Sequence, residues 1–275
     1  MRPDFIIVGA MKSGTSTLAH YLRQHPEIYM PDDEVHFFYE EGRGHWQKGV
    51  TWYEAQFQEA SVKQIVGEKT PTYSYLPAIP KRIHDLLPDI KLIWVFRNPV
   101  DRTYSNYWHA VCQGTERSGF AEAVRREDER DKWKGYVRRS QYSDQVDRYL
   151  DYFDRDQMYF SLFEDLKGDP EALLEEVFHF LEVDPKYSQQ SNNRVRENVT
   201  KIPRFATARY ITRSISDEIP LLGALIYYLD QCVNRRGESG YPEMDEGIRD
   251  HLRVYFQKYN DKLEDLTGLD TSKWN

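Results

Sequence analysis

A single lysine lies in a loop rich in glycine, serine and threonine that follows the first apolar segment of the chain. The segment Phe5–Val8 has the character of a buried strand, and an amphipathic stretch begins after the loop. Such a strand-loop-helix unit points the N–H groups of a helix N-terminus at the space above the strand end, which favours an anion. The loop adds hydroxyl donors and one ammonium charge. The candidate anion ligands are Lys12, Ser13, Gly14, Thr15, Ser16 and Thr17.

The position of this lysine differs from that in a Walker A loop, GxxxxGK[ST], where the lysine follows the second glycine. Gly9 and Gly14 have the Walker separation, but Thr15 occupies the lysine's position and Lys12 lies inside the loop. A lysine inside the loop can follow charge that develops on a bridging oxygen during group transfer. The simpler alternative is an ordinary helix start with a Ser/Thr N-cap, although a cap needs only one hydroxyl and no lysine.

A second pair of candidate anion ligands follows the apolar segment Lys91–Phe96. Arg97 would project from the end of this strand, and Ser105 from the second turn of the next helix, so both can converge on an anion near the first loop. A kinase would favour an aspartate for Mg²⁺ at such a strand end, so arginine disfavours a metal-nucleotide site. The alternative is that Arg97 pairs with a carboxylate and that Ser105 is merely exposed.

The elements that must position these residues alternate along the chain. Apolar runs alternate with segments of helical periodicity, which predicts an α/β fold with a central parallel sheet, flanking helices and a mainly helical C-terminal third. Strands are expected at Phe5–Val8, Glu27–Met30, Ile65–Glu68, Lys91–Phe96 and Met158–Leu162. Helices are expected at Pro80–Leu87, Val100–Cys112, Gln141–Phe153, Pro170–Leu181 and Glu246–Leu266. We expect a single domain over residues 1–275, with its ligand beyond the carboxyl ends of the strands.

Composition excludes several classes of protein. The 275 residues carry a net charge of −8, which argues against a nucleic-acid partner because such proteins present a basic face. No apolar run approaches the roughly 18 residues of a membrane span, and the N-terminus lacks a signal-peptide pattern. The two cysteines, Cys112 and Cys232, have neither metal-ligand spacing nor the number needed for a disulfide framework. We therefore expect a cytoplasmic protein with no membrane span and no metal.

Together, the two anion-binding segments resemble those of the PAPS-dependent sulfotransferase family, where PAPS is 3′-phosphoadenosine 5′-phosphosulfate. The segment Met11–Ser16 resembles the family's 5′-phosphosulfate loop. Phe96-Arg97-Asn98-Pro99, with Ser105 eight residues after the arginine, is similar to its 3′-phosphate motif. The resemblance implies that Lys12 takes part in catalysis as well as in nucleotide binding.

Further segments extend this resemblance over most of the chain, with Trp274 and the residues before it similar to bacterial members. Phe163-Glu164-Asp165-Leu166 is similar to the family segment whose aromatic residue stacks on adenine. Arg235, Arg236 and Gly237 begin a stretch that resembles the loop closing over the 3′-phosphate. The resemblance thus implies that Phe163 and these three residues complete the nucleotide site.

Two more segments suggest residues for the transfer reaction. The stretch containing Glu34 and His36 resembles the Glu-Val-His-Phe-Phe element of heparan-type carbohydrate O-sulfotransferases, in which the glutamate acts as a base. His36 could orient or replace that base, because an imidazole titrates in the right range. Lys69 lies in a Lys-Thr-Pro segment that the family places beside the reacting group. The alternatives are that Glu34 is one acid on a solvated loop, that His36 is a satisfied half-buried histidine and that Lys69 is exposed after a strand end.

The resemblance implies an enzyme that moves the sulfuryl group of PAPS to a hydroxyl of a carbohydrate, lipid or small-molecule acceptor and releases adenosine 3′,5′-bisphosphate (PAP). Lysines and a carboxylate suffice for this chemistry, so no metal is expected. The alternatives are a P-loop-type nucleotide or small-molecule kinase and a non-catalytic nucleotide-binding module. The acceptor, the choice between O- and N-sulfation and the oligomeric state stay open.

Overall fold

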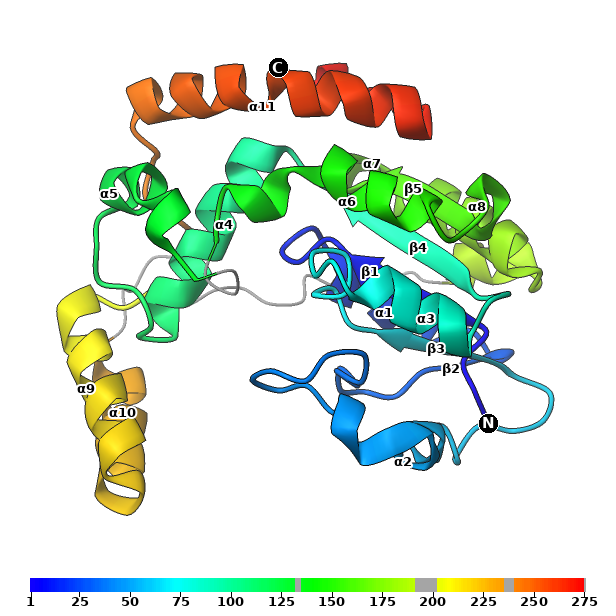
Figure 1. The fold of residues 1–275 in the computed structure, drawn as a ribbon, viewed down its shortest axis with the longest axis horizontal. Coiled ribbons are helices and arrows are strands. Elements are labelled where there is room, and N and C mark those ends of the chain that lie inside the picture. Colours follow the sequence, from blue (N-terminus) through cyan, green and yellow to red (C-terminus); the bar gives the residue numbers. More distant parts are fainter. Residues whose placement is uncertain (132–134, 191–201, 235–239, 275) are drawn as a thin grey trace. The chain divides into compact units, whose positions relative to one another are not determined.

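The computed structural model describes residues 1–131, 135–190, 202–234 and 240–274 (Figure 1). Within these ranges a five-stranded sheet has the strand order β2-β3-β1-β4-β5, and each neighbouring pair is parallel. The strands are β1 Phe5–Gly9, β2 Ile28–Tyr29, β3 Ile65–Lys69, β4 Lys91–Phe96 and β5 Met158–Leu162. Each lies where the sequence predicts a strand, and the α/β fold class is confirmed.

The helices follow the strands as crossovers and form most of the C-terminal part. They are α1 Thr15–Leu22, α2 Gly49–Ala55, α3 Ile79–Leu86, α4 Pro99–Cys112, α5 Phe120–Arg125, α6 Tyr142–Leu150, α7 Phe163–Gly168, α8 Pro170–Leu181, α9 Ala206–Glu218, α10 Pro220–Val233 and α11 Glu246–Thr267. Short 3₁₀ helices connect some of them. None of the helices in the described ranges combines the length and apolarity that a bilayer span requires.

Two compact units can be distinguished from contacts within the chain. One contains Met1–Asn98, Tyr142–Glu197 and Lys258–Asn275, and the other contains Pro99–Gln141 and Asn198–Gln257. The first unit holds the whole sheet. The expectation of one domain over residues 1–275 stays a prediction.

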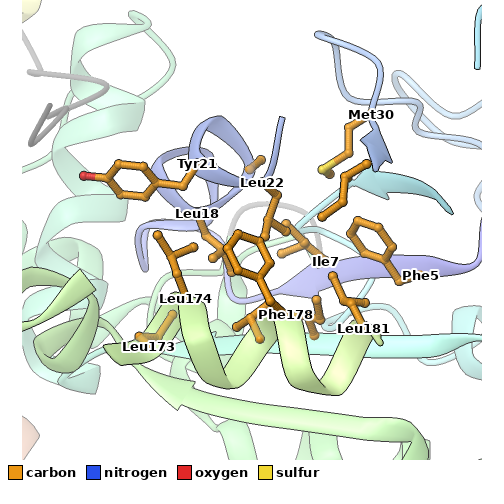
Figure 2. Packing of buried hydrophobic residues seen from close by; sticks show 14 of the residues in the cluster. Phe5, Ile7, Leu18, Tyr21, Leu22, Met30, Leu173, Leu174, Phe178 and Leu181 are labelled. Carbon is orange, nitrogen blue, oxygen red and sulfur yellow. The ribbon is translucent and has the colours of Figure 1, made fainter. Parts of the chain in front are cut away.

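One face of the sheet in the first unit packs against α1 and α8 (Figure 2). Phe5 and Ile7 of β1 and Ile93 and Val95 of β4 point into this layer. The helices contribute the buried side chains of Leu18, Leu22, Leu173, Leu174, Phe178 and Leu181. This packing fixes the start of α1, and with it the loop that connects β1 to α1.

The opposite face is covered in part by α6. Trp94 and Phe96, which alternate with Ile93 and Val95 along β4, lie with their ring centroids 4.9 Å from those of Tyr149 and Tyr142, respectively. A strand covered on both faces reads as a continuous apolar run, which explains why β4 is easily recognised in the sequence.

The second unit is organised around α4, α9 and α10. The guanidinium of Arg209 on α9 is buried, forms an ion pair with Asp230 on α10 and donates from Nη1 to the carbonyl of Cys112 at a distance of 2.9 Å. A buried ion pair is tolerated only when its remaining donors are also satisfied, as they are here. This arginine therefore ties the three helices together.

Candidate active site

Four strands of the first unit end at the same edge of the sheet and deliver the candidate residues. Lys69 is the last residue of β3, the lysine-containing loop follows β1, Arg97 follows β4 and Phe163 follows β5. The central strand β1 lies between β3 and β4, so the chain changes direction across the sheet at this loop. Doubly wound sheets bind ligands at such a switch point.

The loop after β1 approaches its neighbours too closely for an ordinary side chain at its centre. Gly14 has φ +88°, and a Cβ atom added to it would lie 2.6 Å from Cδ2 of Phe163. Gly14 also occupies the N-cap position of α1, where no side chain caps the helix. The simpler Ser/Thr N-cap interpretation is therefore wrong, because the residue at the cap has no hydroxyl.

The donors of this loop fit a bound phosphate. Ser13 is fully buried, and within the described residues its hydroxyl oxygen has no hydrogen-bond partner. The first N–H groups of a helix also lack partners within the helix, and the N-cap residue of α1 is a glycine, which has no side chain to satisfy them. Lys12 precedes these groups with φ +71° and adds positive charge. Buried, unsatisfied donors are costly, and an anion would satisfy them.

Arg97 lies against the same loop. Its Nη1 atom donates to the carbonyl of Lys12 at 3.4 Å, and its guanidinium carbon lies 5.1 Å from the ring centroid of Phe163. The Tyr142 hydroxyl donates to the carbonyl of Arg97 at 3.0 Å. In the part of the chain that the structure describes, Arg97 is thus held by the loop and the aromatic ring, and its pairing with a carboxylate stays an alternative.

The ends of β4 and β5 are joined by a carboxylate and by the C-terminal tryptophan. Glu164 accepts from the backbone N–H of Asn98 at 3.3 Å and from the Trp274 indole at 3.1 Å. The Asn98 side-chain amide donates to the carbonyl of Trp274 at 2.8 Å. These bonds hold in place the chain on either side of Arg97 and Phe163.

Phe163 is the first residue of a helix, because β5 ends at Leu162 and the acidic residues in the first turn of α7 favour a helix there.

Ser105 belongs to the second unit, on α4. It is buried, and its hydroxyl is hydrogen-bonded to that of Tyr241 at 3.1 Å, so it is not merely exposed. The predicted 3′-phosphate ligands Arg235, Arg236 and Gly237 lie outside the described residues.

The candidate base and its neighbours form a cluster in the first unit. Glu34 Oε1 lies 3.2 Å from Lys69 Nζ, and Glu34 Oε2 lies 3.4 Å from His36 Nε2. Lys69 also donates to the Ser16 hydroxyl at 3.1 Å. Its side chain is only 9% exposed, so the alternative that Lys69 simply follows a strand end into solvent is wrong. One ammonium group thus connects the candidate base to the first turn of α1.

His36 lies beside Glu34, and its surroundings act on its protonation in opposite directions. Burial lowers the pKa of His36, although the charge of Glu34 opposes this shift. The Tyr39 hydroxyl is bonded to His36 Nδ1. If Tyr39 donates to Nδ1, the proton of the neutral ring resides on Nε2 and points at Glu34. His36 has φ +53°, so the two side chains are brought together by a left-handed turn at His36 and not by an extended segment.

Beneath this cluster lies a carboxylate that the sequence reasoning did not select. Glu68 is fully buried in β3 and accepts hydrogen bonds from the hydroxyls of Tyr53, Thr70 and Tyr73. Burial raises the pKa of Glu68 to about 7, while the three hydroxyl groups act in the opposite direction. An acidic residue inside an apolar strand is a signal that could have identified Glu68. The tyrosines carry no such signal, because the chain contains 20 of them.

In the ranges that the structure describes, no group of three or more His, Cys, Asp or Glu side chains is arranged to hold a metal ion. The candidate site is instead made of hydroxyl groups, cationic side chains and one partly exposed carboxylate. This carboxylate belongs to Glu34, whose side chain is 32% exposed. Such a set can bind an anionic nucleotide and accept one proton.

Comparison with known proteins identifies the family of this chain. The chain matches the sulfotransferase domain family over residues 2–214, and it belongs to that family. It is 28% identical to heparan sulfate glucosamine 3-O-sulfotransferase 6 of Mus musculus over 271 residues, which span 98% of this chain and 72% of the relative. Members of the family are sulfotransferases that use PAPS as the sulfuryl donor.

Solved structures resemble the fold over the whole chain. A sulfotransferase from Alicyclobacillus acidocaldarius is 28% identical, with a TM-score of 0.73 over 100% of this chain and 99% of the other. The mouse sulfotransferase SULT7A1, solved in complex with PAP, is 15% identical, with a TM-score of 0.51 over 99% of this chain and 87% of the other. An identity of 15% shows a shared fold and nothing more for the mouse protein.

Proposed function

We propose that this protein transfers the sulfuryl group of PAPS to an acceptor hydroxyl, with Glu34 as the general base. The observation that carries the proposal is the position of Lys69, whose ammonium group contacts both Glu34 and Ser16 of the nucleotide loop. A base must lie within reach of the proton that it removes while the acceptor faces the donor. One lysine side chain separates Glu34 from the loop that fits a phosphosulfate.

PAPS, when bound, supplies the sulfuryl group and a 5′-phosphate leaving group. The acceptor oxygen forms a bond to sulfur, the bond from sulfur to the bridging phosphate oxygen breaks, and the hydroxyl proton goes to Glu34. Lys12 neutralises the charge that grows on the bridging oxygen, and Lys69 stabilises the sulfonyl oxygens. His36 keeps Glu34 oriented through its Nε2 proton.

The remaining ligands hold the nucleotide. Ser13, Gly14, Thr15, Ser16 and Thr17 bind the 5′-phosphosulfate through hydroxyl and backbone N–H groups. The 3′-phosphate is bound by Arg97, Ser105, Arg235, Arg236 and Gly237, while the Phe163 ring stacks on adenine. The fit of the buried Ser13 hydroxyl and the Arg97 guanidinium supports this assignment.

Carbohydrate hydroxyls are the acceptor class that we place first. The support is the likeness to heparan sulfate 3-O-sulfotransferases, which extends over 98% of the chain. Lipid and small-molecule hydroxyls come next, since a net charge of −8 does not favour a long polyanionic acceptor. A kinase is disfavoured, because Arg97 stands where such an enzyme would hold Mg²⁺ with an aspartate.

The test is release of PAP from PAPS, measured with a panel of sugars, phenols, sterols and hydroxyacyl compounds, in EDTA and in Mg²⁺. We expect acceptor-dependent release at the same rate in both. Absence of release with every acceptor, joined to absence of PAPS binding by calorimetry, would overturn the proposal. Turnover that requires ATP and Mg²⁺ would establish the kinase instead.

A further inference from the structure

The buried carboxylate of Glu68 is connected to the segment that carries Glu34 and His36. The hydroxyl of Thr70 donates to Glu68 Oε2 at 3.0 Å and accepts from the backbone N–H of His36 at 3.3 Å. The hydroxyl of Tyr73 likewise donates to Glu68 Oε2, at 3.4 Å. Two hydroxyl groups therefore lie between one carboxylate oxygen and the backbone next to the candidate base.

Tyr73 receives the next two N–H groups of this segment. The backbone N–H of Phe37 donates to its hydroxyl oxygen at 2.7 Å, and that of Phe38 does so at 3.4 Å. Three consecutive N–H groups thus end on hydroxyls that are themselves directed at Glu68. These bonds take the place of sheet or helix bonds, because residues 31–36 have no regular secondary structure.

The carboxylate decides how the hydroxyls are oriented. Each hydroxyl has one proton, and above its pKa of about 7 the Glu68 carboxylate only accepts hydrogen bonds, so in this ionised state the protons of Thr70 and Tyr73 point at Glu68 and their lone pairs face the backbone. Without that acceptor the hydroxyl protons could turn towards the N–H groups and repel them. The left-handed backbone of His36, at φ +53°, makes this segment dependent on such anchoring.

We infer that Glu68 is a positioning residue for sulfuryl transfer: through Thr70 and Tyr73 it fixes the backbone of residues 36–38 and thereby aims Glu34 and His36 at the acceptor. Glu68 itself touches neither the acceptor nor the nucleotide. The inference rests on the proposed role of Glu34, and it adds that the base works only while the hydroxyl relay beneath it is intact.

The test compares variants that differ by a single hydroxyl. Tyr73→Phe removes the oxygen that receives two of the N–H groups, and Thr70→Val removes the one that receives the third, while Thr70→Ser restores it. Tyr149→Phe is the matched control, because the Tyr149 hydroxyl is equally buried and near enough to feel the charge of Glu68, but the hydrogen bond that it donates goes to the Tyr73 carbonyl at 3.1 Å. Glu68→Gln provides an independent probe of the carboxylate charge.

We expect Tyr73→Phe, Thr70→Val and Glu68→Gln each to lower kcat about 10- to 100-fold, with PAP affinity by calorimetry unchanged, because a displaced base costs rate rather than nucleotide binding. Thr70→Ser should recover most of the rate, and Tyr149→Phe should lose stability without losing kcat. Equal kcat losses in Tyr73→Phe and Tyr149→Phe, or parallel losses of kcat and PAP affinity, would overturn the inference.

Measuring Glu34→Gln in the same experiment distinguishes the proposed role of Glu34 as the base from the proposed positioning role of Glu68. If Glu34→Gln retains full turnover, the proposed function of Glu34 fails, and this inference fails with it. If Glu34→Gln is inactive while Tyr73→Phe, Thr70→Val and Glu68→Gln turn over normally, the base stands and only the positioning role of Glu68 is wrong.

Discussion

Single side chains in this protein show how position changes the chemistry of a common residue type. Lys12 and Lys69 are both lysines at the carboxyl edge of the sheet, yet Lys12 lies in a left-handed loop conformation and Lys69 is almost buried between Glu34 and Ser16. Two carboxylates differ in the same way, because Glu34 is partly exposed whereas Glu68 is fully buried.

Lys12→Ala should depress turnover far more than nucleotide affinity. The lysine is proposed to meet charge that appears on the bridging oxygen only as the bond to sulfur breaks, so it contributes mainly to the transition state. We expect kcat to fall about 100-fold or more, while the Kd for PAP changes only a few-fold. Calorimetry and steady-state kinetics on the same preparation measure both. If kcat and PAP affinity fall by the same factor, Lys12 serves nucleotide binding and not the transition state.

Glu68 should make the stability of the protein depend on pH in a definite direction. Its pKa is about 7 in the folded protein and 4.5 ordinarily, so between these values the folded state retains a proton that the unfolded chain has lost. Stability contributed by that proton is present below pH 4.5 and is lost as the pH rises to about 7. The loss amounts to about 3 kcal/mol.

The stability advantage of Glu68→Gln over the natural protein should therefore grow from pH 4.5 to 7 and then level off. Urea unfolding at several pH values measures it, with Tyr149→Phe as a buried-site control whose difference stays constant. The titratable groups that act on Glu68 are Tyr53 and Tyr73, through hydrogen bonds, and Glu34, through its charge; the buried Tyr149 in turn feels the charge of Glu68. A difference that shrinks with rising pH would contradict the assignment.

Residues that act directly can be predicted from the sequence, whereas residues that act through a chain of hydrogen bonds cannot. Glu34, His36 and Lys69 were expected together because their segments resemble known sulfotransferase elements, and the structure brings them within 3.4 Å contacts. Glu68, Thr70 and Tyr73 are close together in the sequence, but the backbone that they hold, residues 36–38, lies 34 to 36 positions away from the hydroxyl that each N–H contacts. Neither periodicity nor spacing indicates that two hydroxyls share one buried carboxylate.

At the scale of elements, the loop between β1 and α1 depends on one glycine. Gly14 combines a left-handed φ of +88° with an approach to Phe163 that leaves no room for a Cβ atom. The helices that flank this loop and its neighbour, α1 and α8, pack their apolar side chains against β1 (Figure 2). The sequence predicted these elements well, because β1, β4 and α8 are long apolar or amphipathic runs.

Gly14→Ala should weaken nucleotide binding as well as stability. A non-glycine residue in the left-handed region costs about 1–2 kcal/mol, and the added methyl group must also displace the Phe163 ring. We expect PAP affinity to fall about tenfold, which corresponds to ~1.4 kcal/mol. Gly168→Ala is the matched control, since a Cβ there meets nothing within 4 Å. Similar PAP affinities in the two variants would show that the close approach at Gly14 is unimportant.

The elements that the sequence did not predict individually have weak local signals. The helix α2 begins at a glycine and is only seven residues long, and α7 begins directly at the end of β5. Both lack the length over which helical periodicity becomes visible. The left-handed conformation of His36 was also unforeseen, because a non-glycine residue rarely adopts it without support from its surroundings.

At the scale of the whole molecule, the chain uses one parallel sheet to bring four strand ends to one edge. The first unit holds the sheet with the cluster of Glu34, His36 and Lys69 and the loop between β1 and α1, and the second unit holds Ser105 within α4. A net charge of −8 on a protein that binds an anionic nucleotide means that its cations must be concentrated locally. The loop lysine, Lys69 and Arg97 provide such a concentration in the first unit.

The proposed function depends above all on Glu34, which removes the proton of an acceptor hydroxyl while PAPS donates its sulfuryl group. This role is tested by the rate of PAP release from PAPS with a saccharide acceptor. The rate is compared between the natural protein and Glu34→Gln after calorimetry has shown that both bind PAP with the same affinity. We predict acceptor-dependent release by the natural protein and a decrease of about 10²- to 10⁴-fold in the variant, the usual contribution of a general base. Undiminished release by Glu34→Gln would contradict the account.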